Sequence, residues 1–282
     1  MISFDGKSAV ITGGSSGIGL AIAEHLARLG AHICLLARDR ERLKTASERV
    51  LEARRSPNQQ VITVAADVAD YDQLSQALIP ALSSFGTPDL LVNSAGITYP
   101  GLFEQLDLDI HRQNMEINYF GTLHTIRLIL PGMIRRKSGH IVNISSLVGI
   151  HGLYGYSAYS PSKFAVRGLS DSLRYELKPH GIHVSVAFPS DTQTPQLEFE
   201  KNLKPPVLRA LVDSNTKPFP ADVVARKIID GVRKEKYLIF PSSDSFFLFI
   251  IYSLFPGHSL YWLVDRLMDQ AYRKAAKDLA GH

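Results

Sequence analysis

The 282-residue sequence has little of several features on which other classes of protein depend. It contains one cysteine, which excludes an internal disulfide framework and suits a reducing compartment. That cysteine, Cys34, lies in an apolar, strand-like run, so we expect a buried, unreactive thiol. The ten histidines show neither metal-ligand spacing nor an H-E-x-x-H motif. No metal site is therefore predicted.

The excess of positive over negative charge is also small. The formal net charge is +4 and no basic segment is long enough to indicate a nucleic-acid partner. The N-terminus lacks the charged segment and the apolar segment of a signal peptide, because Met1–Lys7 leads directly into a predicted strand. We therefore expect a protein of the cytoplasm, or of the cytosolic face of a membrane, and not a secreted one. Its length suits one large α/β domain or two small ones.

The first part of the chain alternates between strand and helix around a glycine-rich turn. Apolar runs at 9–11 and 33–36 predict buried strands, and 20–29 has the apolar spacing of a helix. The turn between them, T-G-G-S-S-G-I-G at 12–19, has the strand-to-helix context of a dinucleotide-binding loop. An ordinary glycine-rich turn is the alternative. The predicted cofactor contacts in this turn are Gly13, Ser15, Ser16, Gly17, Ile18 and Gly19.

The residues after the second strand bear on the choice between NAD and NADP. An acidic residue at this place would accept the ribose 2′-hydroxyl and favour NAD, and Asp39 is the residue that argues for it. Arg38, however, is the first side chain past the strand, and a guanidinium suits a 2′-phosphate. Arg42 lies one helical turn on and adds a second cation, although both arginines could also belong to a solvated helix start. We predict NADPH/NADP+ as the cofactor.

The alternation continues through the chain. Strands are predicted at 61–64, 89–92, 140–144, 183–188 and 237–240, and helices at 71–85, 106–133, 159–177 and 221–233. Repeated β-α-β spacing implies right-handed crossovers and a parallel sheet. Further cofactor contacts are predicted where strands end, at Asp67, Val68, Asn93, Ala95 and Gly96. Asn118, by contrast, falls in mid-helix, where asparagine is unfavourable and needs a reason, such as holding a water or a carbonyl in a proton path.

Three residues have the chemistry of a proton-transfer site. Tyr159 and Lys163 are four apart and so share one helix face. A phenol titrates near ~10, and a neighbouring ammonium is expected to lower that pKa toward neutrality. Ser146 follows the predicted strand 140–144, at the edge where open α/β sheets bind ligands. Taken alone, Tyr-x-x-x-Lys also fits a helix that carries a tyrosine and an exposed lysine.

Taken together, these motifs resemble the classical short-chain dehydrogenase/reductase family. The matching segments are Thr12–Gly19, Asp67, Asn93–Gly96, Asn118, Ser146 and Y-S-P-S-K at 159–163. The resemblance implies a Rossmann-type, doubly wound, seven-stranded parallel sheet and hydride transfer between a nicotinamide cofactor and a carbonyl or alcohol carbon. By the same analogy Tyr159 is the acid/base, Ser146 polarises the carbonyl, Lys163 lowers the tyrosine pKa and binds the nicotinamide ribose, and Asn118 places a relay water. Pro189 and Thr192 are expected to contact the cofactor.

The sequence after the sixth strand narrows the resemblance. The family commonly has Pro-Gly there, whereas this chain has P-S-D-T-Q-T-P at 189–195, which looks like the 3-ketodihydrosphingosine reductase branch. That branch implies NADPH-dependent reduction of a long-chain lipid ketone, 3-ketosphinganine, to sphinganine in sphingolipid biosynthesis. The alternatives are a steroid, retinol or other alcohol dehydrogenase of the family and, more distantly, a catalytically silent nucleotide-sensing protein.

Substrate specificity is expected in two segments, 149–156 and the Pro-rich loop 191–220, whose length suggests a lid. Asp191, Glu198 or Glu200 could meet a cationic amine, but we expect the two glutamates to be solvated surface residues.

The last residues form the second part of the predicted organisation, a reductase domain at 1–240 and a helical tail at 241–282. The apolar run 246–255, closed by Pro256 and Gly257, is about half the ~20 residues that a spanning helix needs. An amphipathic helix with Arg266, Arg273, Lys274 and Lys277 follows. This pattern suits peripheral contact with an anionic membrane through 246–277. Packing on the domain, or a homodimer or homotetramer interface, is the alternative.

Overall fold

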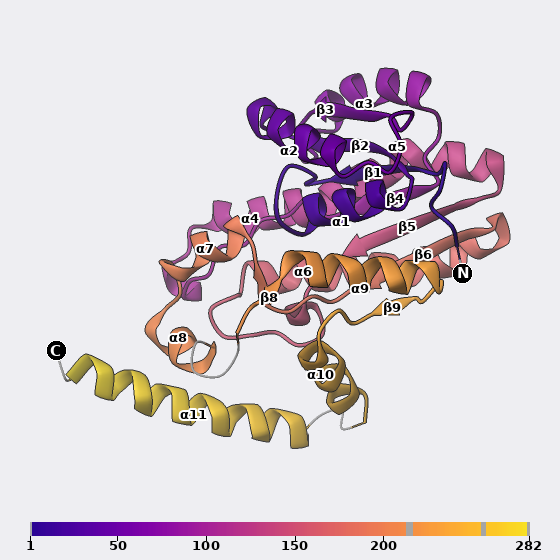
Figure 1. The fold of residues 1–282 in the computed structure, drawn as a ribbon. Coiled ribbons are helices and arrows are strands. Elements are labelled where there is room, and N and C mark those ends of the chain that lie inside the picture. Colours follow the sequence, from indigo (N-terminus) through magenta and orange to yellow (C-terminus); the bar gives the residue numbers. More distant parts are fainter. Residues whose placement is uncertain (1, 213–216, 255–257, 281–282) are drawn as a thin grey trace.

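The computed structural model describes residues 2–212, 217–254 and 258–280, and these are arranged around a parallel sheet of seven strands (Figure 1). This confirms the predicted doubly wound α/β fold. Each strand lies within a residue or two of its predicted position. In sheet order the strands are β3 (Val61–Ala65), β2 (His32–Ala37), β1 (Ser8–Thr12), β4 (Leu90–Asn93), β5 (Gly139–Ile144), β6 (Ile182–Ala187) and β9 (Leu238–Ile239).

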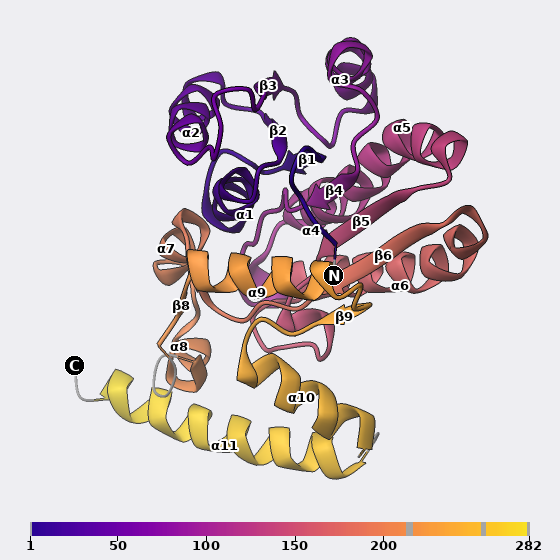
Figure 2. The ribbon, with the colours of Figure 1, turned by 45° about the vertical axis from the view of Figure 1, so that its right-hand side comes forward.

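Helices cover both faces of the sheet (Figure 2). One face is packed by α1 (Gly17–Arg28), α2 (Arg40–Glu52) and α9 (Ala221–Arg233), and the other by α3 (Tyr71–Phe85), α5 (Gly121–Arg136) and α6 (Tyr159–Leu177). The core strands are buried on both sides, which explains why they read as continuous apolar runs. Cys34 is among these residues, and burial raises the pKa of its thiol to about 12. It is therefore the inert thiol that its sequence context predicts.

The order of the strands reverses at one point in the sheet, between β1 and β4, where the connections that follow these two strands leave in opposite directions. After β1 the chain passes outward to β2 and β3, then returns to β4 on the other side of β1. Parallel strands that diverge in this way leave a crevice at their carboxyl ends, which is where such sheets bind ligands. The glycine turn after β1 and the segment after β4 both lie at this crevice.

The predicted helix 106–133 is interrupted. The chain instead forms a short 3₁₀ turn (η1, Phe103–Gln105), α4 (Leu108–Met115), one π-helical turn (η2, Glu116–Phe120) and then α5. Asn118 lies in the π turn, where its amide pairs with the backbone of Ile97. The wider turn thus brings a polar side chain inward, which resolves the unfavourable position of this asparagine. Single π turns are rare and often mark functional sites.

The predicted loop 191–220 is more ordered than expected. It contains β7 (Thr192–Gln193), α7 (Pro195–Lys201), α8 (Pro206–Val212) and β8 (Phe219–Pro220), with β7 and β8 paired in a small sheet of their own. Thr194 caps α7 by accepting a hydrogen bond from the Leu197 amide at 3.2 Å. Two further 3₁₀ turns, η3 (Leu147–Gly149) and η4 (Lys178–His180), flank α6.

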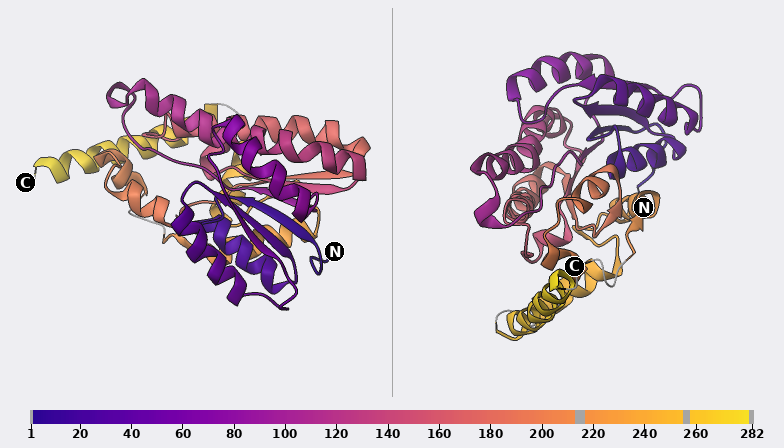
Figure 3. Two further views of the ribbon diagram at one scale, coloured as in Figure 1. Left: turned by 90° about the horizontal axis from the view of Figure 1, so that it is seen from above. Right: turned by 90° about the vertical axis from the view of Figure 1, so that its left-hand side faces the viewer.

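The tail forms two helices, α10 (Ser243–Leu254) and α11 (His258–Ala280). The break expected at Pro256 and Gly257 lies outside the described residues. One side of α10 packs on the domain, where Leu248, Phe249 and Tyr252 meet a small core that includes Phe188. Helix α11 lies beside α8, and its C-terminal half extends away from the sheet (Figures 1 and 3). None of the helices in the described part of the chain is both long and apolar enough to cross a bilayer.

Two glycines provide a test of the packing. A Cβ at Gly19 would overlap the carbonyl oxygen of Gly13, whereas a Cβ at Gly168, inside α6, meets nothing within 4 Å. We expect Gly19→Ala to lower the free energy of unfolding and to abolish dinucleotide binding. Gly168→Ala is expected to raise the free energy of unfolding by about 0.5–1 kcal/mol, because alanine loses less backbone entropy in a helix. Urea denaturation of both variants checks this, and a neutral Gly19→Ala would contradict it.

Candidate active site

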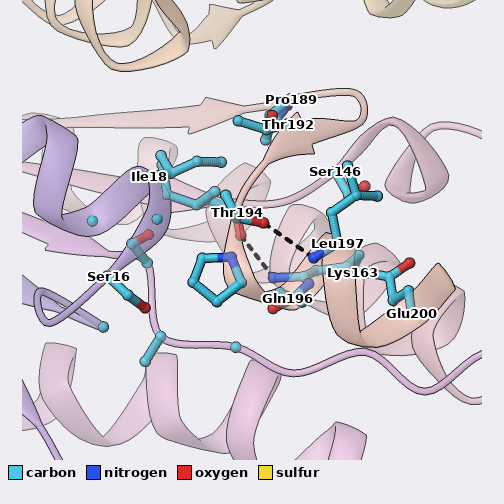
Figure 4. A pocket seen from close by; sticks show the side chains of 18 of the residues that line it. Ser16, Ile18, Ser146, Lys163, Pro189, Thr192, Thr194, Gln196, Leu197 and Glu200 are labelled. Carbon is cyan, nitrogen blue, oxygen red and sulfur yellow. Dashed lines mark hydrogen bonds between the residues drawn. The ribbon is translucent and has the colours of Figure 1, made fainter. Parts of the chain in front are cut away.

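One cavity of about 490 Å³ runs along the carboxyl ends of the strands, from the glycine turn to the segment 191–220 (Figure 4). This volume suits a ligand of cofactor or drug size. The cavity brings together nearly all the predicted site residues. Those that line it are Gly13, Ser15, Ser16, Gly17, Ile18, Gly19, Arg38, Arg42, Asp67, Val68, Ala95, Gly96, Ser146, Tyr159, Lys163, Pro189 and Thr192.

The two predicted residues that do not line the cavity lie behind it. Asn93 is buried at the end of β4, where its side chain accepts a hydrogen bond from Thr125 at 2.6 Å and donates one to Asn143 at 2.8 Å. Its side-chain amide joins β4 to β5 and α5. Asn118 donates to Ile97 and Ser162 at 2.9 and 2.8 Å and accepts from the Ile97 amide at 2.8 Å. Both side chains support the cavity wall.

The glycine turn fits a dinucleotide. Gly13 has φ of 65°, and a Cβ there would lie 2.8 Å from the backbone nitrogen of Ala95. The turn can therefore approach the segment after β4 only because it lacks side chains at this point. Helix α1 begins at Gly17 and presents its free amides to the same cavity. Backbone amides at a helix N-terminus, in a cradle that a side chain would fill, form a pyrophosphate site.

The adenosine end of the cavity is lined by charged, exposed side chains. Arg38 Nη1 lies 3.5 Å from Asp67 Oδ2, and Arg42 Nε lies 3.5 Å from Asp39 Oδ2. Asp39 also caps α2 by accepting from the Arg42 amide at 3.0 Å. The side chain of Asp39 is thus engaged at the start of α2, and both Asp39 and Arg38 line the cavity. Exposed pairs of this kind contribute little to stability, so the arginines can exchange them for a phosphate.

The catalytic candidates come from two adjoining elements. Ser146 follows β5, and Tyr159 and Lys163 occupy the first turns of α6. Lys163 is 5% exposed, its Nζ donates to the carbonyl of Ile144 at 3.0 Å, and it lies 5.6 Å from the centre of the Tyr159 ring. The Ile144 contact joins α6 to the end of β5 and so sets the position of the tyrosine relative to Ser146.

The electrostatics of this pair differ from expectation. Burial, and then the Glu200 carboxyl group, raise the pKa of Tyr159, although hydrogen bonding to Ser146 lowers it. Burial also lowers the pKa of Lys163 to about 8. The expectation that Lys163 brings the pKa of Tyr159 toward neutrality is therefore wrong, because the groups of the protein together raise that pKa. Desolvation outweighs attraction here, and Tyr159 carries its proton at neutral pH.

The side chain of Glu200 is buried, contrary to the expectation from the sequence. Glu200, expected in solvent, is 7% exposed, lines the cavity and accepts a hydrogen bond from Tyr156 at 2.8 Å. Glu198 is exposed as expected and pairs with Lys201 at 2.7 Å. The available signal was helical spacing, since Glu200 lies three residues after the buried Leu197.

Comparison with known proteins agrees with this geometry. Residues 7–203 match the family model for short chain dehydrogenases. The chain belongs to this family. As a short-chain dehydrogenase it is an oxidoreductase with a fold that binds NAD or NADP. It is similar to a 3-dehydrosphinganine reductase of Danio rerio, at 39% identity over 82% of this chain and 70% of that protein.

Solved structures of the family superpose on the chain. A short-chain dehydrogenase/reductase from Burkholderia phymatum in complex with NAD is 26% identical, with a TM-score of 0.78 over 90% of this chain and 95% of that one. A short-chain dehydrogenase from Sphingobium yanoikuyae in complex with NADPH is 25% identical, with a TM-score of 0.73 over 96% and 95% of the two chains. Similar folds thus hold either nicotinamide cofactor.

The buried lysine generates a prediction about stability. Lowering its pKa from about 10.5 to about 8 in the folded state corresponds to a cost of about 3 kcal/mol at neutral pH. Lys163→Met removes this cost and one hydrogen bond worth about 1 kcal/mol, so the variant should be inactive but about 2 kcal/mol more stable at pH 7.

The sign of the pH dependence follows from proton counting. Between pH 8 and pH 10.5 the unfolded chain binds more protons at Lys163 than the folded one, so wild-type stability rises with pH relative to the variant. The variant's advantage should disappear by about pH 10.5. Denaturation of both proteins at pH 7 and pH 10.5 measures it. Lys178→Met, at an exposed lysine just after the same helix, is the control. A variant of unchanged or lower stability at pH 7 would contradict this account.

Proposed function

We propose that this short-chain dehydrogenase is an NADPH-dependent reductase of long-chain lipid ketones, with 3-ketosphinganine as its substrate and sphinganine as its product. The observation that carries the proposal is the single cavity that continues from the glycine turn, past Tyr159 and Ser146, to apolar side chains at Leu153, Leu197 and Leu211. The likeness to reductases named for this ketone supports the choice of substrate.

The chain's own residues account for the proton chemistry. Ser146 donates a hydrogen bond to the ketone oxygen and polarises the carbonyl. The glycine turn and Lys163 would hold a nicotinamide cofactor, which would supply the hydride for the carbonyl carbon. Tyr159, whose raised pKa keeps it protonated, gives its proton to the oxygen as negative charge develops there. Lys163 stands beside the resulting phenolate and stabilises it.

Reduction of a ketone needs an acid at Tyr159. Since burial and Glu200 both raise the pKa of Tyr159, the resting site holds the acid form. The choice of a lipid-ketone reductase over a steroid or retinol dehydrogenase rests on the likeness to reductases named for this ketone.

The decisive assay is NADPH oxidation by the purified protein with 3-ketosphinganine. We expect turnover that is lost in Tyr159→Phe by at least about 10³-fold, because removal of the proton donor leaves the developing alkoxide without an acid. Binding of NADPH to the variant should persist, as measured by nucleotide fluorescence. Turnover of steroids or retinoids in place of lipid ketones would overturn the proposed substrate. NADPH binding without turnover of any ketone would instead favour a nucleotide sensor.

The preference for NADPH rests on Arg38. Replacing it with alanine removes the guanidinium that borders the adenosine end of the cavity, so we expect kcat/KM for NADPH to fall about 10- to 100-fold. The value for NADH should change less than about threefold. Arg40→Ala is a matched control, because Arg40 is exposed at the start of α2 and does not line the cavity. Equal losses with both cofactors would contradict NADP selection.

We also propose that the tail rests on an anionic lipid surface, which would suit a lipid substrate. Exposed apolar side chains gather on the side of α10 that faces away from the domain, and Arg266, Arg273 and Lys274 are exposed on α11. Helix α8, which α11 contacts, contributes Leu211 to the cavity, so the tail lies next to the apolar end of the site. The exposed apolar residues of α10 are Phe246, Phe247, Ile250, Ile251 and Leu254.

Vesicle sedimentation tests the lipid contact. The wild type should sediment with vesicles of phosphatidylserine and phosphatidylcholine, more weakly at high salt. The double variant Phe247→Ser with Leu254→Ser, which removes the two most exposed of the α10 side chains named above, should bind at least about 10-fold less. Phe103→Ser is the control, since Phe103 is 73% exposed but lies in η1, outside the tail. Equal sedimentation of all three proteins would indicate that α10 has another partner, such as a second copy of the chain.

A further inference from the structure

The cavity contains a carboxyl group that the reduction of a ketone does not use. Glu200 belongs to α7 and is directed into the cavity with Leu197, on the same side as Ser146 and Lys163 (Figure 4). It is 7% exposed and is held by the hydroxyl of Tyr156 at 2.8 Å. Burying a carboxyl group is costly because it is removed from water, and a hydroxyl partner brings no opposite charge to offset that cost. Its place therefore needs a reason.

Charged and polar groups of several elements surround Glu200. Tyr156 faces it from the turn before α6 and Tyr159 from the first residue of α6, whereas Gln196 lies on the same helix α7, and Asp191 and Lys204 lie on either side of that helix. The Lys204 ammonium lies 4.0 Å from Asp191. The Lys163 ammonium lines the same cavity, 5.6 Å from the centre of the Tyr159 ring. Burial raises the pKa of Glu200 to about 7, so a cation bound beside it would draw it into the charged form.

The distance to the reacting atoms fits a particular class of substrate. Glu200 is close enough to Tyr159 to raise the pKa of the phenol, and the ring of Tyr156, which holds Glu200, lies 5.9 Å from the ring of Tyr159. A substrate group that meets Glu200 therefore lies on the same side of the cavity as the carbonyl that Tyr159 protonates. In a 2-amino-3-ketone the ammonium is on the carbon next to the carbonyl.

We propose that Glu200, positioned by Tyr156, binds the ammonium of a 2-amino ketone and makes this enzyme selective for amino ketones over simple lipid ketones. This rests on the proposed function and specifies its substrate class. The alternative is that the hydrogen bond between Glu200 and Tyr156 only anchors α7 over the cavity. The two roles predict different effects on two substrates.

The test compares 3-ketosphinganine with 1-hydroxyoctadecan-3-one, which has the same chain, hydroxyl and ketone but no amine. For Glu200→Gln, which keeps the shape and the contact with Tyr156, we expect kcat/KM for the amino ketone to fall about 10- to 100-fold, chiefly through KM. The amine-free ketone should change less than about threefold. Glu198→Gln, on the same helix but exposed and paired with Lys201, should alter neither.

Each outcome decides between the roles. Equal losses with both ketones would overturn the proposal and assign Glu200 to anchoring α7. Wild-type enzyme that reduces both ketones equally well would also overturn it, yet leave the lipid-ketone reductase in place. Wild type that reduces neither would refute the proposed function as well.

A measurement on the wild type alone guards against a variant that does not fold. The amine product sphinganine should inhibit at least about 10-fold more strongly than octadecane-1,3-diol. Equal inhibition by the two would overturn the proposal.

Discussion

The buried ammonium of Lys163 is the constraint on which the site depends. Its bond to the carbonyl of Ile144 ties the start of α6 to the end of β5, the strand that Ser146 follows. That bond orients Tyr159, four residues earlier on the same helix, toward the cavity. The apolar cores on the two sides of the sheet offset the free-energy cost of burying this ammonium. The active site thus lowers the stability of the fold locally, and the large core compensates for that loss.

The fold could be predicted from the sequence because local and global signals agree. Strands buried on both faces give continuous apolar runs, and the bounds of α3, α6 and α9 coincide with the predicted ranges 71–85, 159–177 and 221–233. The catalytic residues followed from motif spacing for the same reason. They are fixed to element ends, and element ends are what sequence patterns locate best when glycine, proline and capping residues mark them.

What could not be predicted depends on contacts between distant segments. The π turn around Asn118 forms because its amide meets Ile97, twenty-one residues away. The pKa of Tyr159 is raised first by burial and then by Glu200, which reaches the site from a helix in a segment that was expected to be a loop. A neighbouring lysine suggested a lower pKa, but burial has the opposite sign and here the larger effect. Residue spacing in the sequence predicted that Tyr159 and Lys163 lie close together, but it did not predict how deeply both side chains are buried.

The segment 191–220 connects the two ends of the cavity, and this arrangement has a consequence for specificity. At its start, Thr194 lies against Gly17, where an added Cβ would come within 3.1 Å of the Thr194 methyl group. Glu200, less than two turns along α7, faces the substrate end. The opposite end is lined by Arg38 and Arg42 together with Asp39 and Asp67, so both ends of the cavity carry charges of both signs. Helix α7 thus meets the glycine turn at its capping residue and the cavity at Glu200, so any displacement of α7 from the glycine turn would also displace Glu200.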